Sequence, residues 1–311
     1  MGTATDASTE DVTADDGTRL RLRKRAPAAG AETAVLFVHG ATYPGGPVFD
    51  LEGASWLAAC ARRGRAGYAV DLRGYGDSEA PPELDAAPGD HSPVVRADRA
   101  AGDVAAALER VRESHGRVHL VGYSWGTMVC GRLLSTRDPG VASLTQFAPV
   151  YSFPDGLALA ADDSAYRTVS ERGVRERWNA HFEGAGDPDG YRDPAAMDAF
   201  WTALTATGQA VEREGKTVVR APNGTLADMS AAADGDPPYD PADVDAPALV
   251  ARGSLDDSAT RADALGVYDA LGAREDRREY AEVAGGSHFL PVERRRGALF
   301  DAVAGFHDRC E

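Results

Sequence analysis

Residues 118–128 read VHLVGYSWGTM, an apolar run followed by a serine between two glycines. The run predicts a buried strand over residues 118–121, and the stretch after Ser124 predicts a helix. Gly122 and Gly126 permit a sharp turn from strand to helix, because larger side chains there would collide with neighbouring elements. Such a turn exposes the serine hydroxyl beside the N–H groups of the helix, which favour developing negative charge. The stretch therefore predicts an α/β fold with Ser124 as a nucleophile.

A serine hydroxyl is a weak nucleophile, so it needs a general base and an acid that orients the base. His288 lies in the loop VAGGSHFL, between an expected strand and the last helix, and is the predicted base. An expected strand over residues 248–252 leads into Asp256 and Asp257. Asp256 is predicted to orient the histidine, and Asp257 is the alternative. One of the two aspartates could instead cap the helix that follows.

An oxyanion that forms during acyl transfer needs two N–H donors. The backbone N–H of Trp125, directly after the nucleophile, is the first predicted donor. The second should come from the loop after the first parallel strand, where Ala41 is the predicted donor and Thr42 the alternative. His39 ends that strand and is expected to shape the loop.

Expected strands alternate with expected helices along the chain. The strands cover residues 34–38, 66–71, 118–121, 141–147 and 248–252, and the first helices cover about 50–63 and 94–114. This alternation predicts βαβ units and a mostly parallel central sheet flanked by helices. Before them, Asp16-Gly17 separates two short strand-like runs, which predicts a hairpin with a type I′ turn.

The region from 152 to 243 breaks the alternation. It holds aromatic residues among acidic and Pro/Gly-rich pieces, and we interpret it as a mostly helical lobe inserted between two strands. The predicted domains are a core of residues 9–151 and 244–311, and an insertion of residues 152–243. Residues 1–8 are expected to be a disordered N-terminus.

Composition excludes several classes of protein. The formal net charge of −16 argues against nucleic-acid binding, which requires clustered Lys and Arg. No apolar run approaches the roughly 20 residues that span a bilayer, and residues 1–20 lack the features of a secretory signal. Three scattered cysteines fit a reduced cytoplasmic compartment and no disulfide framework. We predict no cofactor and no metal site, and the choice between monomer and homodimer stays open.

Together these residues resemble the α/β-hydrolase superfamily. The chain order Ser124, Asp256, His288 agrees with that superfamily and differs from the orders in trypsin-like and subtilisin-like proteases. Further matches are His39-Gly40 and residues 71–78, 122–126, 253–256 and 286–288. The resemblance covers roughly residues 10–150 and 244–308, and the 152–243 segment resembles a cap domain by position only. It implies an α/β-hydrolase fold with an inserted, mainly helical cap.

Within the superfamily, haloalkane dehalogenases and epoxide hydrolases use an aspartate nucleophile, so Ser124 argues against both activities. The Ser-Trp-Gly element is similar to that of proline iminopeptidases, but those carry a His-Gly-Gly-Pro-Gly loop where this chain has residues 39–44, HGATYP. The resemblance implies a serine hydrolase that cleaves a carboxylic ester or thioester of a small acyl substrate. Four alternatives stay open: a C–C bond hydrolase, an aminopeptidase, a biosynthetic acyltransferase or cyclase, and a ligand-binding module without activity.

Aromatic side chains near these motifs are expected to line an apolar acyl pocket. They are Tyr43, Tyr123, Trp178, Trp201 and Phe289. The alternative is that they pack the core or the contact between core and insertion. The acyl group itself is not predicted by the sequence.

Overall fold

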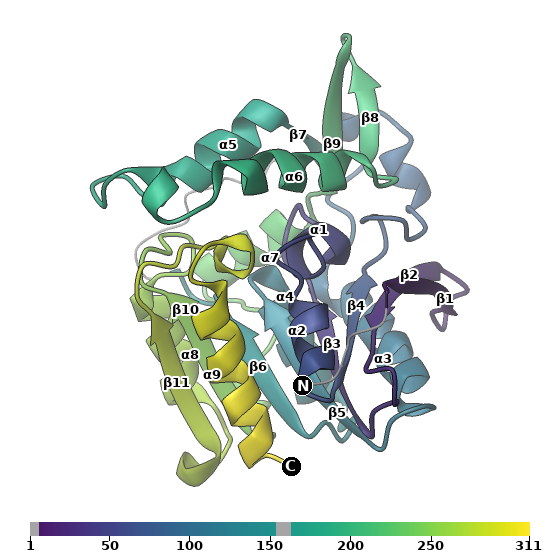
Figure 1. Ribbon diagram of the computed structural model, residues 1–311. Helices are drawn as coiled ribbons and strands as arrows, with labels where there is room; N and C mark the ends of the chain where they lie inside the picture. The colour runs from purple at the N-terminus through teal and green to yellow at the C-terminus, as the bar shows by residue number, and fades with distance from the viewer. Residues whose placement is uncertain (1–5, 154–162) are drawn as a thin grey trace.

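The main sheet, in a computed structural model that describes residues 6–153 and 163–311, has eight strands in the order β1-β2-β4-β3-β5-β6-β10-β11 (Figure 1). The strands are β1 (Ser8–Thr13), β2 (Arg19–Arg25), β3 (Thr33–Val38), β4 (Ala66–Asp71), β5 (Arg117–Tyr123), β6 (Ser143–Phe147), β10 (Ala248–Gly253) and β11 (Arg278–Val283). The pairs β1–β2 and β2–β4 are antiparallel, and the remaining neighbours are parallel. The predicted α/β fold with a mostly parallel sheet is confirmed.

Helices cover this sheet. They are α1 (Gly45–Phe49), α2 (Trp56–Arg62), α3 (Ala97–Arg112), α4 (Trp125–Thr136), α8 (Arg261–Ala270) and α9 (Arg296–Arg309). All six residues of β3 are buried, which requires cover on both faces of the sheet. On one face α2 and α9 meet, and the rings of Trp56 and Phe300 stack at 4.6 Å. No helix in the described part of the chain combines the length and the apolar character that crossing a membrane requires.

The helix expected over about 50–63 is shorter than predicted. α1 ends at Phe49, and α2 begins only after Ser55, whose side chain accepts a hydrogen bond from the N–H of Ala58 at 2.9 Å. A serine in this position satisfies an otherwise unpaired N–H at the first turn, so it fixes where the helix begins. The other long helix, expected over 94–114, is α3.

The predicted hairpin is present as β1 and β2, but the prediction of a type I′ turn between them is wrong. Val12 pairs with Leu20 and Thr13 with Arg19, so residues 14–18 connect the strands. Within that connection only Gly17 has a positive φ, of 88°, whereas a type I′ turn requires two consecutive positive values. The expectation of disorder over residues 1–8 is also wrong at its end, because Ser8 already pairs with Lys24. Residues 1–5 lie outside the described part of the chain.

The elements between β6 and β10 form a separate group. They are β7 (Tyr166–Ser170), α5 (Glu171–Ala180), α6 (Pro194–Thr205), β8 (Ala210–Arg213), β9 (Lys216–Pro222) and α7 (Gly224–Ala233). In Figure 1, α5 and α6 lie across the top of the main sheet. β7, β9 and β8 form an antiparallel sheet that the prediction of a mostly helical lobe missed. These strands are short and carry many charged residues, so their alternation was too weak to identify them. The first residues of the expected insertion, 154–162, lie outside the described residues.

Short 3₁₀ helices occur in the connections. They are η1 (Pro82–Leu84), η2 (Pro88–Asp90), η3 (Pro188–Gly190), η4 (Pro241–Asp243), η5 (Glu275–Arg277) and η6 (Leu290–Val292).

Candidate active site

Ser124 lies at the sharp turn between β5 and α4. Its backbone has φ 54° and ψ −125°, a strained conformation for a residue with a side chain. A Cβ atom added to Gly122 would lie 2.6 Å from the carbonyl oxygen of Gly126, and one added to Gly126 would lie 2.4 Å from that of Val38. Both distances are too short for any side chain. The steric reason that the sequence suggested for the two glycines therefore holds in the structure.

Ser124, His288 and Asp256 form a connected row of side chains. The Oγ of Ser124 lies 3.0 Å from Nε2 of His288, and Nδ1 of His288 lies 2.8 Å from Oδ2 of Asp256. The serine follows β5, the aspartate follows β10, and the histidine follows β11. Because these strands are parallel, their ends meet at one edge of the sheet and bring together residues that are 164 positions apart. All three side chains are buried.

The other oxygen of Asp256 is held by backbone. Oδ1 accepts hydrogen bonds from the N–H groups of Ser258 and Ala259, at 3.0 and 2.8 Å. Asp256 therefore both contacts the histidine and caps the turn that follows, which the sequence had suggested as separate roles for two aspartates. With both oxygens fixed, the carboxylate has one orientation toward His288.

Burial and charge act against each other at this pair. Burial alone raises the pKa of Asp256, but the charge and hydrogen bond of His288 outweigh it and hold the pKa below its ordinary value. Burial lowers the pKa of His288, and the negative charge of Asp256 only partly opposes this. Asp256 is therefore ionised and His288 neutral at neutral pH, with the Nδ1–H donated to the carboxylate. That tautomer leaves Nε2 as an acceptor for the hydroxyl proton of Ser124.

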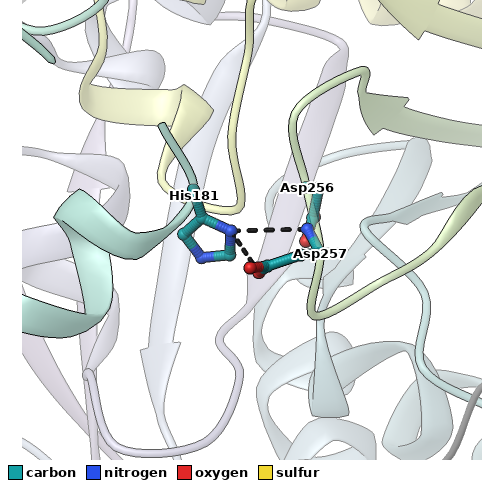
Figure 2. Close-up of side chains that lie close together, drawn as sticks. All are labelled: His181, Asp256 and Asp257. Atoms are coloured by element: carbon teal, nitrogen blue, oxygen red, sulfur yellow. Dashed lines mark hydrogen bonds and ion pairs between the residues drawn. The ribbon is translucent and has the colours of Figure 1, made fainter. Parts of the chain in front are cut away.

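Asp257 contacts a histidine of the inserted segment, His181 (Figure 2). Nδ1 of His181, the residue that ends α5, lies 2.5 Å from Oδ1 of Asp257. The hydrogen bond from His181 lowers the pKa of Asp257. The side chain of Asp257 is 63% exposed, whereas that of His181 is buried. The two neighbouring aspartates thus hold two different histidines.

His181, Asp256 and Asp257 also offer atoms of the kind that bind metals, all within 4.8 Å of one another. Each carboxylate, however, already accepts a short hydrogen bond from a histidine. We therefore interpret the group as two His–Asp pairs side by side. Sequence reasoning missed His181, because nothing local in the sequence connects the end of α5 to the loop after β10.

The loop after β3 approaches the serine closely. A Cβ added to Gly40 would lie 2.7 Å from Cβ of Ser124, so only glycine fits at this position. Among the described residues the N–H of Ala41 has no hydrogen-bond acceptor, and the N–H of Trp125 begins α4, where the helix supplies none. At both positions predicted as oxyanion donors, the N–H group thus has no acceptor among the described residues.

His39 and Thr42 hold this loop in place. The ring of His39 contacts the carbonyl of Gly40 through Nδ1 at 2.8 Å and accepts from the N–H of Leu72 at 3.1 Å. Burial lowers the pKa of His39 to about 4, which keeps it in the neutral form that both contacts require. Thr42 has a positive φ of 80°, rare for a β-branched residue, and its side chain accepts from Arg167 at 2.6 Å. The expectation that His39 shapes the loop agrees with these contacts.

A buried aspartate of α7 fixes the indole that follows the nucleophile. Nε1 of Trp125 donates to Asp228 at 2.9 Å, and the N–H of Ala97 donates to the same carboxylate oxygen at 2.7 Å. Arg96 pairs with the other oxygen. Burial raises the pKa of Asp228, and the Arg96 hydrogen bond opposes this. Asp228 thereby ties the beginning of α4 to the insertion and to α3.

A second buried carboxylate, Glu293, organises the loop that carries His288. It accepts from the N–H of Ser287 at 2.9 Å, from the hydroxyl of Ser287, and from Nε1 of Trp178 in α5 at 2.9 Å. On the other side, the hydroxyl of Tyr123 donates to the carbonyl of His288 at 3.0 Å. The histidine backbone is therefore held both by the core and by the inserted segment.

Four of the five aromatic residues predicted to line a pocket form ring contacts with His288 or its neighbour Phe289, or are Phe289 itself. Phe289 stacks on Trp178 at 4.7 Å and lies 5.6 Å from Tyr43, while Tyr123 lies 5.1 Å from His288. These side chains are nearly fully buried, so they pack the contact between core and insertion. The fifth, Trp201, is part-buried and has no ring contact within the described residues. Phe200, its neighbour, joins the aromatic group instead, at 5.1 Å from Tyr43.

With this geometry in hand, comparison with known proteins identifies the family. The model of the alpha/beta hydrolase family matches residues 35–302. The chain belongs to this family. The recognised superfamily and its fold are thus confirmed.

Among curated proteins, this α/β hydrolase is 31% identical over 158 residues to epoxide hydrolase 2 of Siraitia grosvenorii. The match covers 47% of this chain and 44% of that protein, so the chain spans less than half the length of the curated relative.

Solved structures resemble the α/β hydrolase over nearly its whole length. The esterase RhEst1 from Rhodococcus sp. ECU1013 is 22% identical, with a TM-score of 0.64 over 98% of this chain and 100% of that one. A serine hydrolase involved in carbazole degradation is 17% identical, with a TM-score of 0.64 over 97% and 99%. A thioesterase domain from the curacin biosynthetic pathway is 12% identical, with a TM-score of 0.62 over 96% and 100%. At these identities the likeness concerns the fold.

Proposed function

We propose that this α/β hydrolase is a serine hydrolase that cleaves a carboxylic ester or thioester through an acyl-enzyme on Ser124. The observation that carries the proposal is the row Ser124–His288–Asp256, with contacts of 3.0 and 2.8 Å. His288 is the proposed general base and Asp256 the acid that orients it. The N–H groups of Ala41 and Trp125 are the proposed oxyanion donors.

The reaction proceeds in two halves. As the Oγ of Ser124 attacks the carbonyl carbon, its proton passes to Nε2 of His288, and the carbonyl oxygen becomes negative beside the two N–H donors. The C–O or C–S bond then breaks, and the leaving group departs with the proton from His288. In the second half His288 takes a proton from water and the hydroxide attacks the acyl carbon. The bond between that carbon and Oγ of Ser124 then breaks, His288 returns the proton to Oγ, and the acid is released.

The residues of this site do not suit epoxide hydrolysis, although the curated relative is named an epoxide hydrolase. Attack of a serine oxygen on an epoxide carbon would form an ether, which has no carbonyl for water to attack. Attack on an ester instead gives an acyl group on Ser124, whose carbonyl faces the same two donors in both halves. The serine thus favours acyl chemistry.

We also propose that the segment of residues 152–243 acts as a cap over this site, with the core in residues 9–151 and 244–311. Two contacts support this: Trp178 of α5 donates to Glu293, and His181 pairs with Asp257. Both join the segment to the loops that carry His288 and Asp256. A substrate would bind between α5 and the nucleophile.

A burst experiment tests the acyl-enzyme. Mixed with p-nitrophenyl acetate in excess, the protein should release about one equivalent of p-nitrophenol per chain before a slower steady rate, because deacylation limits turnover of activated esters. Mass spectrometry of acid-quenched protein should find the acetyl group on the peptide that contains Ser124. Protein treated first with a fluorophosphonate serves as the control and should show neither. An acetyl group on a different residue would contradict the assignment.

The pH profile tests the role of His288. The base must be neutral to take the proton of Ser124, and burial lowers its pKa below the ordinary value of about 6.5. We expect kcat/KM for p-nitrophenyl acetate to be constant near neutral pH and to fall with unit slope at acidic pH, with a midpoint below about 6.5. Tryptophan fluorescence at each pH checks that the fold persists. A midpoint above 7 would show that His288 is not the titrating base.

A further inference from the structure

Helix α5 turns one face toward the triad. Counted from Val174, three further residues follow at positions +3, +4 and +7: Arg177, Trp178 and His181. This spacing places all four on one face of the helix. Trp178 stacks on Phe289 and His181 pairs with Asp257, so the residues on either side of Arg177 on this face touch the loops of the site. Val174, Trp178 and His181 are buried, whereas Arg177 is only part-buried.

The side chain of Arg177 has neither a hydrogen bond nor an ion pair within residues 6–153 and 163–311. The other arginines of the described chain that lack such a partner are all exposed: Arg62, Arg117, Arg137, Arg277 and Arg295. The chain has 49 acidic residues against 33 lysines and arginines, so acidic partners are abundant. No nitrogen of Arg177 is among the fully buried polar atoms without a partner in the described part of the chain, so its guanidinium stays open to an anion from outside the chain. Among the described residues it has no acceptor, so its N–H donors are available to a ligand.

The charge of Arg177 acts on the groups around the nucleophile. Burial is the largest influence on the pKa values of Tyr43, Tyr123 and His288, and in each case Arg177 lowers the pKa further or opposes the rise. For His288 this has a cost, because the proposed mechanism makes the ring cationic in the transition state. The positive charge of Arg177, which has no acidic partner among the described residues, opposes that step. An anion bound to the guanidinium would remove the opposition.

We propose that Arg177 binds a carboxylate carried by the substrate, so that the preferred substrates are esters or thioesters with a free acid group, such as half-esters of dicarboxylic acids. This inference rests on the proposed hydrolase function and names its substrate class. A guanidinium offers two parallel N–H donors to a carboxylate, which gives orientation as well as affinity. The same contact neutralises the charge beside His288, so the anion should favour the acylation step as well as binding.

The test compares esters that differ only in charge. Monoethyl glutarate carries the carboxylate on the acyl side, and 3-acetoxypropanoate carries it on the alcohol side. Each is paired with its neutral primary amide, which has nearly the same shape. We expect the wild-type protein to hydrolyse at least one acid with a kcat/KM about tenfold or more above that of its amide. The pair with the larger ratio identifies the side of the ester that α5 faces.

In Arg177→Gln that ratio should fall at least about tenfold, because the charge-assisted contact is lost and the amide substrate never made it. Arg172→Gln is the matched control: Arg172 lies on the same helix, and its side chain is 85% exposed. In the control the ratio should stay within about twofold of wild type. Equal ratios in wild type and Arg177→Gln would overturn the inference.

A binding measurement keeps this result separate from the hydrolase proposal. Glutarate is titrated by calorimetry into Ser124→Ala and into Ser124→Ala with Arg177→Gln. We expect the second protein to bind glutarate at least about tenfold more weakly. If no ester is hydrolysed but this difference is found, the proposed function fails while the carboxylate site stands. Equal binding by the two proteins overturns the carboxylate site, whatever the esters show.

Discussion

Replacing Ser124 with alanine is expected to lower kcat for p-nitrophenyl acetate by about 10⁴- to 10⁶-fold. The variant keeps Cβ, so the strained backbone at φ 54° and the contact with Gly40 are unchanged, and only the nucleophilic oxygen is lost. Without that oxygen His288 has no hydroxyl to deprotonate and no acyl-enzyme can form. The residual rate would come from the oxyanion donors and from binding alone. The measurement is the steady-state rate, together with labelling by a fluorophosphonate.

Ser135→Ala is the matched control for that variant. Ser135 lies further along α4, and within the described residues its hydroxyl contacts only the carbonyl of Arg132, at 3.3 Å. The Ser135→Ala protein should hydrolyse p-nitrophenyl acetate and be labelled by the fluorophosphonate like wild type. Near-ultraviolet circular dichroism should show the same packing in all three proteins. A Ser124→Ala protein that keeps more than a few per cent of the rate, or that is still labelled, would remove Ser124 from the reaction.

The central sheet could be predicted because several of its strands are recognisable from their own residues. Residues 34–38, 66–70 and 248–251, in β3, β4 and β10, are apolar runs, which are typical of strands buried on both faces. The turn at Ser124 was equally readable, because its two glycines are required by contacts with the strand and helix that flank it. Asp256 and His288 follow strands, and the ends of parallel strands converge. For these residues, position along the chain implies position in space.

The residues that were missed depend on contacts between distant segments. His181, Arg177 and Glu293 have no motif around them, and what matters about them is the partner each has or lacks. The partner of His181 is 76 positions away, and that of Trp178 is 115 positions away. No local pattern encodes such pairings. The small β7-β9-β8 sheet escaped for a related reason: its strands are short and polar, and their pairing, rather than their composition, makes them strands.

These contacts also explain how an insertion can influence chemistry carried out by the core. Glu293 holds the backbone of Ser287, directly before His288, and is itself held by Trp178 of α5. Movement of α5 would therefore alter the contact between Trp178 and Glu293, and with it the support of the loop that carries His288. The two buried carboxylates, Glu293 and Asp228, join the segment to the loop of His288 and to Trp125, the residue after the nucleophile. The geometry of the triad is thus a property of core and insertion together.

Asp256→Asn is expected to lower kcat for p-nitrophenyl acetate by about 10⁴-fold. The amide oxygen can still accept from the N–H groups of Ser258 and Ala259, so the turn should remain. The amide NH₂ would then face Nδ1 of His288 in place of Oδ2. Nδ1 must become an acceptor, which moves the ring proton to Nε2, where it faces Ser124. His288 in that tautomer cannot take the serine proton, and no negative charge remains to stabilise the imidazolium.

Asp257→Asn is the matched control, because it makes the same chemical change at the neighbouring residue. Asp257 contacts His181 and not His288, and its side chain is 63% exposed, so kcat should stay within about fivefold of wild type. The pair of variants therefore separates the loss of an orienting carboxylate from a general loss of negative charge near the site. Equal losses in the two variants would mean that the field of both aspartates matters more than the tautomer. A large loss confined to Asp257→Asn would assign the orienting role to Asp257 and its partner His181, and would contradict the roles proposed for the two aspartates.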